Sequence, residues 1–454
     1  MKESTIVKYC SIGETEGIGA SAHYLKFDRW GIILDAGLSP QQSGENALPD
    51  YNLLANSPVN GIIVTHAHLD HIGSLPVAIK NFPHARVYMT PATVELANQL
   101  LYHYLLVQRK KQGSGFTPLY TTEFLEAIHF LYQGFKYERA FPLHGYEDSG
   151  LRFSFYDAGH ILGSAGILIE WNGKRIFYTG NTRKSHQFIL RGARYPDAPI
   201  DVLITEATYG ANPTAENVRR LAEVKRFAKS ITERLRMGGV VLLPVFALGR
   251  TQEMIAMIHM LRVRNRIPVA PIYITGMGLK INKTYDRLLH KIYPEFDAGT
   301  LRAMTFDRWK KGKKLKGPAI LLATSGMMLP GTASFDYARE IAANPRNAIY
   351  FVGYADPETP GGLFRDQKYE ELKTLFGVEN IACQVEIFQF SAHSNRRELL
   401  EMIKQMKPRK VVFVHGEQAA LEWMEENTRQ MLPRCQTLIP RQGDWYEFFG
   451  NDSV

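Results

Sequence analysis

Three histidines and one aspartate lie within six residues, in the segment Thr65–His71. Imidazole and carboxylate groups are the usual ligands of zinc, which prefers four nitrogen, oxygen or sulfur donors. The segment follows a short apolar run that is typical of a buried strand. In a tight loop at a strand end, His66 and His68 can face one ion while Asp70 and His71 face another. A surface loop that is rich in histidine by chance is the alternative interpretation.

Two complete metal sites need more donors than this loop supplies, and three further histidines stand in similar positions. His160 follows an expected strand and lies between Gly159 and Gly163, which allow close approach of the backbone to an ion. His415 directly follows an apolar run, and His393 stands where a helix is expected to begin. A lone histidine is more often structural, but these positions at strand and helix ends favour a role as ligand or proton donor.

The elements that must position these residues fall into three stretches. Short strands and turns dominate the first 208 residues, with two helices among them. From about residue 210, strands alternate with helices, which predicts a mainly parallel sheet with crossover helices. Near residue 382, short strand-turn-helix units return. The first helix of the middle stretch is expected to bury one apolar stripe, formed by Val218, Leu221, Val224, Phe227, Ile231 and Leu235.

Composition narrows the class of protein. The chain has 454 residues, of which 45% are hydrophobic and 22% charged, so it is neither disordered, collagenous nor a coiled coil. Its length predicts two to four domains. The net charge of +9 suits a polyanion such as nucleic acid, although many basic proteins bind none.

The cysteines and the hydropathy of the chain indicate the cellular compartment in which the protein is expected. The three cysteines are far apart and form neither a disulfide framework nor a CxxC metal site, which favours a reducing cytoplasm. No apolar run reaches the roughly 18 residues of a membrane helix, and no signal sequence is evident, so we expect no membrane association.

The histidine motifs carry a resemblance to a known family. An HxHxDH motif after a strand, with a distant GHxxGSAG motif around His160, resembles the metallo-β-lactamase superfamily of dinuclear metal hydrolases. Asp35 is similar to the structural aspartate of that superfamily's first motif. Other segments resemble the β-CASP group, which contains nucleic-acid nucleases of the RNA-processing type. These segments are Thr205–Gly210, Pro244–Glu253, Ala323–Met328, Phe351–Tyr354, Ser391–His393 and Val414–Gly416.

The resemblance implies an α/β fold. Residues 1–208 and 382–454 would form a four-layer αβ/βα sandwich, and residues 209–381 would form an inserted α/β β-CASP cap. The active site would lie in a cleft between these parts, where a single strand could reach it. The resemblance therefore implies unpaired RNA as the substrate, and His415 favours RNA over DNA.

The resemblance also implies a ligand set and a reaction. Two zinc ions, or manganese in their place, would activate a hydroxide that hydrolyses phosphodiester bonds, in endonuclease mode, 5′-to-3′ exonuclease mode or both. The expected catalytic residues are Asp70, His393 as proton donor, and Glu206, which orients His393. A strand-end acid that caps the following turn is the alternative interpretation of Glu206. One ion would be held by His66, His68 and His160, the other by Asp70, His71 and His415, with Asn181 between them.

Three residues of the middle stretch are candidate contacts to the RNA backbone. Gly-rich turns such as Ser325-Gly326 present N–H groups to phosphate, and Arg250 would add a forked donor. A helix cap beside Arg250 and a tight turn at Gly326 are equally good structural interpretations.

One departure from the family pattern concerns Asn181, where the family has an aspartate that bridges two metals. A neutral amide oxygen is a poor bridge. Asn181 is therefore either an inactivating substitution or a native residue that leaves a weaker or single-metal site. It supports an alternative function, a catalytically silent RNA-binding partner of an active paralogue. A DNA-directed nuclease of the same family is the other alternative, and the sequence leaves homo-oligomerisation open.

Overall fold

The computed structural model describes residues 6–15, 17–112, 117–297, 299–302, 304, 307–308, 315–353, 355 and 357–449. Tyr354, in one of the segments that resemble the β-CASP group, lies outside the described residues. The chain forms two compact units. The first comprises Met1–His186, Arg191–Glu216 and His393–Val454, and the second comprises Gln187–Leu190 and Asn217–Ala392.

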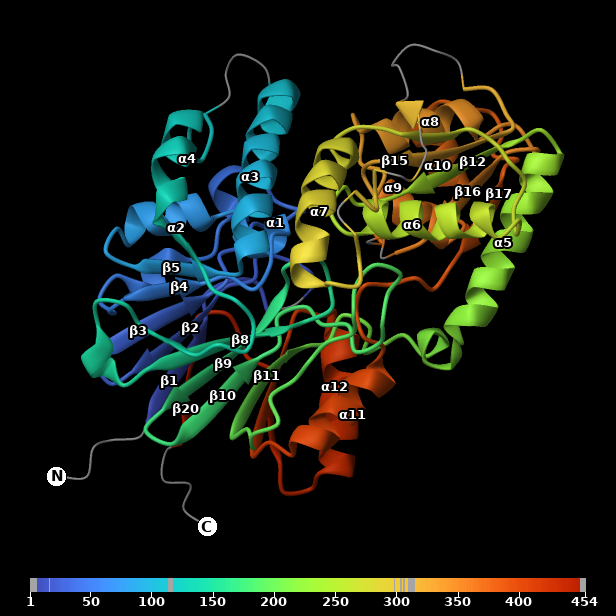
Figure 1. Ribbon diagram of the computed structural model, residues 1–454. Coiled ribbons are helices and arrows are strands. Elements are labelled where there is room, and N and C mark those ends of the chain that lie inside the picture. Colours follow the sequence, from blue (N-terminus) through green and yellow to red (C-terminus); the bar gives the residue numbers. More distant parts are fainter. Residues whose placement is uncertain are drawn as a thin grey trace. The chain divides into compact units, whose positions relative to one another are not determined.

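The first unit contains two seven-stranded sheets (Figure 1). In the first sheet, antiparallel neighbours give way to parallel ones from β3 onward. Because β4 is a parallel strand buried along its whole length, the loop after it emerges at a sheet edge. The strand order is β20 (Trp445–Phe448), β1 (Val7–Ser11), β2 (His23–Phe27), β3 (Trp30–Leu34), β4 (Gly61–Ile63), β5 (Arg86–Met89) and β6 (Tyr132–Gly134).

The second sheet brings distant parts of the chain side by side. Its strand β18 pairs in parallel with β11, with Val414 opposite Glu206, so the residues after both strands emerge at the same edge. β9 and β10 form the hairpin predicted at Asn172-Gly173, where both residues have positive φ as a two-residue turn requires. The order is β19 (Gln436–Leu438), β18 (Lys410–Val414), β11 (Val202–Glu206), β10 (Lys174–Tyr178), β9 (Ala165–Trp171), β8 (Arg152–Asp157) and β7 (Phe141–Pro142).

Helices cover the outer faces of these two sheets. The inner faces share one hydrophobic core, which holds residues such as Leu25 and Ile63 from the first sheet and Ile167 and Val412 from the second. α11 (Arg396–Met406) and α12 (Gln418–Met431) pack on the other face of the second sheet. α1 (Leu69–Ile72), α2 (Leu75–Asn81), α3 (Pro91–Gln112) and α4 (Thr122–Ile128) accompany the first sheet (Figure 1). The four-layer sandwich expected from the sequence is confirmed.

The second unit is built on a single six-stranded sheet in which every pairing is parallel, as predicted. The two faces alternate strictly: in β12, Val241 and Leu243 face one core, while Val240 and Leu242 face the other. The strand order is β14 (Asp307–Arg308), β13 (Ile272–Ile274), β15 (Ala319–Ala323), β12 (Val240–Pro244), β16 (Ala348–Phe351) and β17 (Gln384–Ile387). Its helices are α5 (Arg220–Arg236), α6 (Arg250–Val263), α7 (Gly278–Ile292), α8 (Ala333–Ile341), α9 (Pro360–Arg365) and α10 (Tyr369–Phe376).

Two details differ from the expectations. The apolar stripe of α5 begins at Val224, because Val218 precedes the helix and Leu221 is 79% exposed on its first turn. The second unit extends to Ala392 because β17 pairs with β16 and continues that sheet. Within the described part of the chain, no helix is both long and apolar enough to cross a bilayer.

Candidate metal centre

The first cluster of donors combines the loop after β4 with the loop after β8. His66 Nε2 lies 3.2 Å from His68 Nδ1, and His160 Nε2 lies 3.1 Å from the same nitrogen. His66 and His160 are buried and His68 is partly exposed. A tetrahedral zinc ion with bonds of about 2.0–2.1 Å separates its ligand nitrogens by about 3.3–3.4 Å. The two distances from His68 are close to that spacing, and all three ligand atoms lie within 4.8 Å of one another, so the three imidazoles could share one zinc ion.

The loop that carries His160 is fixed by hydrogen bonds to its own side chains. The Ser164 hydroxyl accepts from the backbone N–H groups of His160 and Ile161, at 3.1 and 3.2 Å. Asp157 Oδ1 accepts from Gly159 N at 2.9 Å. These contacts hold the loop in one conformation. The His160 ring is therefore already placed beside His66 and His68.

The second cluster combines α1 with the residue after β18. Asp70 Oδ2 lies 3.6 Å from His71 Nε2 and 3.3 Å from His415 Nε2. The three ligand atoms all lie within 4.8 Å of one another, as do those of the first cluster. His71 Nε2 is buried and has no hydrogen-bond partner among the described residues. A buried imidazole nitrogen without a partner costs free energy unless an ion or a water binds it, so this observation fits a metal ligand.

The two clusters are adjacent. The ring centroids of His66 and His71 lie 4.1 Å apart, and those of His71 and His415 lie 5.2 Å apart. The segment after β3 packs closely on α1, since a Cβ on Gly37 would lie 1.8 Å from the carbonyl oxygen of Asp70. Only glycine can occupy that position without moving the helix that carries Asp70 and His71.

Asp35 binds one histidine of the second cluster directly and one histidine of the first cluster through Thr65. Its carboxylate accepts hydrogen bonds from His71 Nδ1 at 2.8 Å, from Tyr178 Oη at 2.8 Å, and from the Thr65 N–H at 2.7 Å. The Thr65 hydroxyl also donates to Asp35, and it lies 3.0 Å from His66 Nδ1. Because a hydroxyl has one proton, its oxygen must accept from His66 Nδ1–H. This leaves the Nε2 lone pair of His66 facing His68.

The pKa values of His66 and His71 are shifted in opposite directions. Burial, with help from nearby imidazoles, lowers the pKa of His66 well below its ordinary value. Burial alone would also lower the pKa of His71, but the Asp35 and Asp70 carboxylates raise it. Burial alone would raise the pKa of Asp70, but His71 and His415 lower it, so Asp70 is ionised. The second cluster thus supplies the negative charge that a divalent ion needs.

Asn181 occupies the turn after β10. Its side chain is 2% exposed, and Oδ1 lacks a hydrogen-bond partner within the described part of the chain. The turn packs closely on the metal-binding loop, since a Cβ on Gly180 would lie 2.8 Å from Thr65 Cβ. A buried amide oxygen with no partner suits contact with a cation, although it adds no charge.

His393, which is partly exposed, and the buried Glu206 form a pair beside the clusters. His393 Nδ1 lies 2.7 Å from Glu206 Oε2, and the His393 ring centroid is 4.5 Å from that of His160. Arg183 holds the loop in place by donating to the His393 carbonyl oxygen at 2.7 Å. Burial alone would raise the pKa of Glu206, but the His393 imidazole lowers it below its ordinary value. Glu206 is therefore an ionised acceptor for His393.

The three candidate RNA contacts lie in the second unit. Arg250 begins α6 and is 6% exposed; its guanidinium donates to the carbonyl oxygen of Phe390 and to Gln187 Oε1. Ser325 and Gly326 follow β15, and the Ser325 hydroxyl is buried with no hydrogen-bond partner in the described residues. Arg250 thus makes the contacts of a structural residue, and its contact with RNA stays a prediction.

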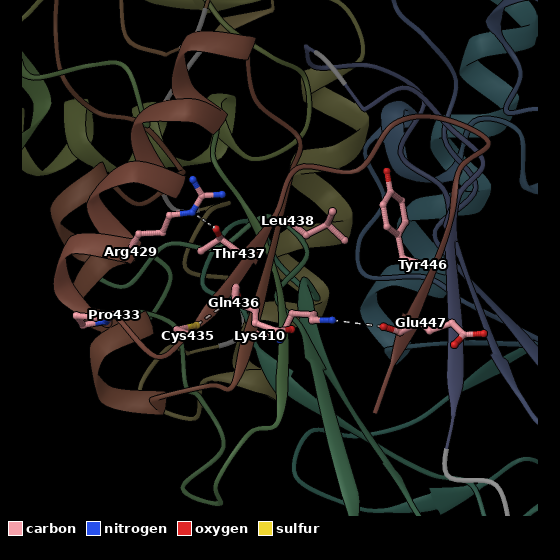
Figure 2. Close-up of a pocket in the computed structure, with 9 residues that line it drawn as sticks. All are labelled: Lys410, Arg429, Pro433, Cys435, Gln436, Thr437, Leu438, Tyr446 and Glu447. Carbon is pink, nitrogen blue, oxygen red and sulfur yellow. Dashed lines mark hydrogen bonds between the residues drawn. The ribbon is translucent and has the colours of Figure 1, made fainter. Parts of the chain in front are cut away.

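A surface hollow of the first unit lies away from these donors. Figure 2 shows Lys410 and Arg429 in it, with Lys410 Nζ donating to the Glu447 carbonyl oxygen and Arg429 Nε donating to Thr437 Oγ1. Lys410 begins β18 and His415 follows its end, so about five residues of extended strand, roughly 16 Å, separate the two. The hollow contains none of the candidate ligands.

Sequence reasoning missed several supporting residues. Thr208 donates to Glu206 Oε2 at 2.5 Å and lies 3.1 Å from His415 Nδ1. Tyr178 binds Asp35, and Arg183 holds His393. Thr208 lies two residues after Glu206, and Thr65 directly precedes His66. This closeness to site residues in the sequence is the signal that could have indicated their supporting roles.

Comparison with known families identifies three domains in the chain. The metallo-β-lactamase superfamily domain matches residues 24–208, the β-CASP domain matches residues 251–363, and the Zn-dependent metallo-hydrolase RNA specificity domain matches residues 378–433. The chain belongs to the metallo-β-lactamase superfamily, in its β-CASP group. The superfamily is metal-dependent, and the two donor clusters of this member fit that chemistry.

Three curated relatives, two from animals and one from an archaeon, illustrate the likeness. This β-CASP protein is 31% identical over 437 residues to cleavage and polyadenylation specificity factor 73 of Drosophila melanogaster, covering 92% of this chain and 61% of that protein. It is 29% identical to the RNase J-like protein of Methanocaldococcus jannaschii, covering 94% of this chain and 98% of that one. Integrator complex subunit 11 of Gallus gallus is 28% identical, covering 99% of this chain and 75% of that one.

A solved structure shares the fold. A protein of unknown function from Enterococcus faecalis superposes with a TM-score of 0.59 at 14% identity, covering 98% of this chain and 100% of that chain. At this identity the likeness concerns the fold alone.

Proposed function

We propose that this β-CASP protein is a metal-dependent ribonuclease that hydrolyses phosphodiester bonds of single-stranded RNA. The observation that carries the proposal is the convergence of six donor side chains into two adjacent clusters, with an imidazole–carboxylate pair beside them. The names of the relatives support RNA as the substrate, because the curated matches include proteins named as endoribonucleases and an RNase J-like protein.

Each cluster would hold one divalent ion. His66, His68 and His160 offer three neutral nitrogens, which suits zinc, and Asp70, His71 and His415 offer one carboxylate and two nitrogens, which suits zinc or manganese. When bound, two such ions lower the pKa of water and stabilise charge on the phosphoryl oxygens.

The protein's own residues supply the proton for the leaving group. In this proposal His393 donates a proton to the ribose oxygen that departs when the P–O bond breaks. Glu206 fixes the ring by accepting from His393 Nδ1, so that Nε2 is the nitrogen that carries the transferred proton. In the second unit, Arg250, Ser325 and Gly326 would contact the RNA backbone.

Asn181 modifies this proposal. An aspartate at residue 181 would place a second carboxylate among the donors, whereas the amide leaves Asp70 as the single carboxylate of the two clusters. We therefore expect the chain with Asn181 to be a weaker enzyme than its Asn181→Asp variant. A silent RNA-binding partner is the alternative that this residue favours.

The test uses labelled RNA and DNA strands of one sequence, each single-stranded and in duplex, with zinc or manganese. We expect the Asn181→Asp variant to cleave the single-stranded RNA, and the His66→Ala form of that variant to be inactive. Preferred cleavage of DNA would indicate a DNA-directed nuclease. A variant that carries two metals but cleaves no nucleic acid would contradict the proposal and favour the silent partner. A circular RNA substrate reports endonuclease activity, because it offers no end to an exonuclease.

A further inference from the structure

Thr208 stands between the two functional halves of the centre. It lies just after β11, and its hydroxyl oxygen is 2.5 Å from Glu206 Oε2 and 3.1 Å from His415 Nδ1. The same carboxylate oxygen, Glu206 Oε2, lies 2.7 Å from His393 Nδ1. One side chain therefore connects a metal-ligand candidate to the pair that is expected to move a proton.

The direction of these hydrogen bonds follows from proton counting. A threonine hydroxyl has one proton, and the short contact to an ionised carboxylate takes it. The hydroxyl oxygen must then accept from His415 Nδ1–H. His415 is thereby held in the tautomer whose Nε2 lone pair points toward Asp70, 3.3 Å away. That lone pair is the one a metal ion needs.

The arrangement is built twice in the first unit. Thr65 donates to Asp35 and accepts from His66 Nδ1–H, while Asp35 also accepts from His71. Thr208 donates to Glu206 and accepts from His415 Nδ1–H, while Glu206 also accepts from His393. In both cases a buried carboxylate binds one imidazole directly and a second one through a threonine hydroxyl.

The backbone at His415 makes such support necessary. His415 has a φ of +54°, in the left-handed region that residues with a side chain rarely adopt. Its carbonyl oxygen receives the Ala207 N–H at 3.3 Å, and Gly17 N donates to Gly416 O at 2.9 Å. These contacts fix the main chain, and the ring itself is held between Thr208 at Nδ1, 3.1 Å away, and Asp70 at Nε2, 3.3 Å away.

We propose that Thr208 is a positioning residue, which sets the tautomer and orientation of His415 and ties the second metal site to Glu206 and His393. The inference rests on the proposed metal centre but not on RNA as the substrate. Removing the hydroxyl should therefore weaken metal binding by the Asp70, His71 and His415 cluster, whatever the substrate is. Partners of metal ligands typically change metal affinity by about 10–100-fold.

The experiment measures zinc affinity by competition with a chelator, on the full chain with asparagine or aspartate at residue 181. We expect Thr208→Val to lower the affinity for one of the bound zinc ions by at least about 10-fold. The zinc affinities of Thr208→Ser should stay within about threefold of those of the parent chain. Thr205→Val is the matched control. Thr205 is also a buried threonine on β11, but its hydroxyl contacts Thr179 and a backbone carbonyl oxygen instead of an imidazole. If Thr208→Val does not fold, Thr208→Ala is measured in its place.

The outcomes separate this inference from the proposed function. Unchanged affinity in the folded Thr208 variants, or an equal loss in Thr205→Val, would overturn the inference. Zinc loss in Thr208→Val without RNA cleavage by any form would support the inference and contradict the ribonuclease. A single zinc ion in the parent chain that is retained by Thr208→Val and lost by Asp70→Ala would also overturn it.

Discussion

Tyr178 and His71 donate hydrogen bonds to the same oxygen of Asp35, each at 2.8 Å. Burial raises the pKa of Tyr178 well above its ordinary value, so the phenol stays protonated and acts as a permanent donor. The Ser21 hydroxyl lies 3.2 Å from the phenol oxygen and extends this buried network. Asp35 is thus locked in the orientation that His71 requires.

We predict that Tyr178→Phe lowers the metal affinity of the second cluster by about 10-fold, because Asp35 loses one of its donors and holds His71 less firmly. Zinc competition with a chelator measures the effect. Tyr24→Phe is the control: Tyr24 is also a buried tyrosine, but its hydroxyl donates to the Pro58 carbonyl oxygen. A similar loss in both variants would show that the phenols act through general stability.

His393 provides a second prediction. We expect His393→Gln to reduce cleavage of RNA by about 10²–10⁴-fold while the bound metal is unchanged, since His393 belongs to neither donor cluster. The activity should recover on a p-nitrophenyl phosphodiester, whose leaving group departs without a proton. If both substrates lose activity to the same extent, His393 is not the proton donor.

Asn181 gives a third prediction, which concerns metal content alone. This turn is buried and packs on Thr65, next to His66, so a carboxylate there would add one negative charge to a centre whose two clusters include a single carboxylate. We expect Asn181→Asp to bind two metal ions, and the chain with Asn181 to bind the second ion at least about 10-fold more weakly. Mass spectrometry under native conditions counts the ions. Equal occupancy of two ions in both forms would show that residue 181 does not bridge them.

His23 links stability to pH. Burial lowers its pKa to about 4, whereas in the unfolded chain an imidazole titrates near its ordinary value of 6.5. Between these values only the unfolded state binds the proton, so the free energy of unfolding falls as the pH drops from about 6.5 to about 4, by about 3 kcal/mol in all.

The measurement compares guanidinium unfolding of the chain and of His23→Gln over this pH range, with a chelator present so that metal release does not contribute. The variant is expected to have a shallower pH dependence, because glutamine does not titrate. Identical pH dependence in the two proteins would show that His23 is protonated in the folded state or is not buried there.

The side chains that form the two clusters could be picked out from the sequence because their signal is local. A histidine directly after a buried strand lies at a sheet edge, which is how the Thr65–His71 segment, His160 and His415 could be assigned to one site. Thr208 and Tyr178 could not be found this way, since their roles exist only once β11 lies beside β18 and β10 lies across from Asp35. Leu221 was wrongly predicted to be buried for a similar reason. Helical periodicity shows which residues share a face, but not which turn of that face first packs against the rest of the fold.

Arg250 illustrates a different limit. Its contact with RNA stays a prediction, but its partners in the fold are the Phe390 carbonyl oxygen and Gln187, which are 140 and 63 residues away in the sequence. A local motif carries no information on such distant partners. The parallel sheet of the second unit, in contrast, was predictable because alternating strands and helices allow few other topologies.

The pairing of β18 with β11 has a consequence for the protein's synthesis. The ribosome makes β11 before Asn217–Ala392, the main part of the second unit, and β18 after it, so the strand that precedes His415 is made late. Until β18 docks, the second donor cluster is incomplete and Thr208 has no imidazole to hold. If the centre cuts RNA, a chain still in synthesis therefore lacks the complete second cluster until residues 410–415 have been made.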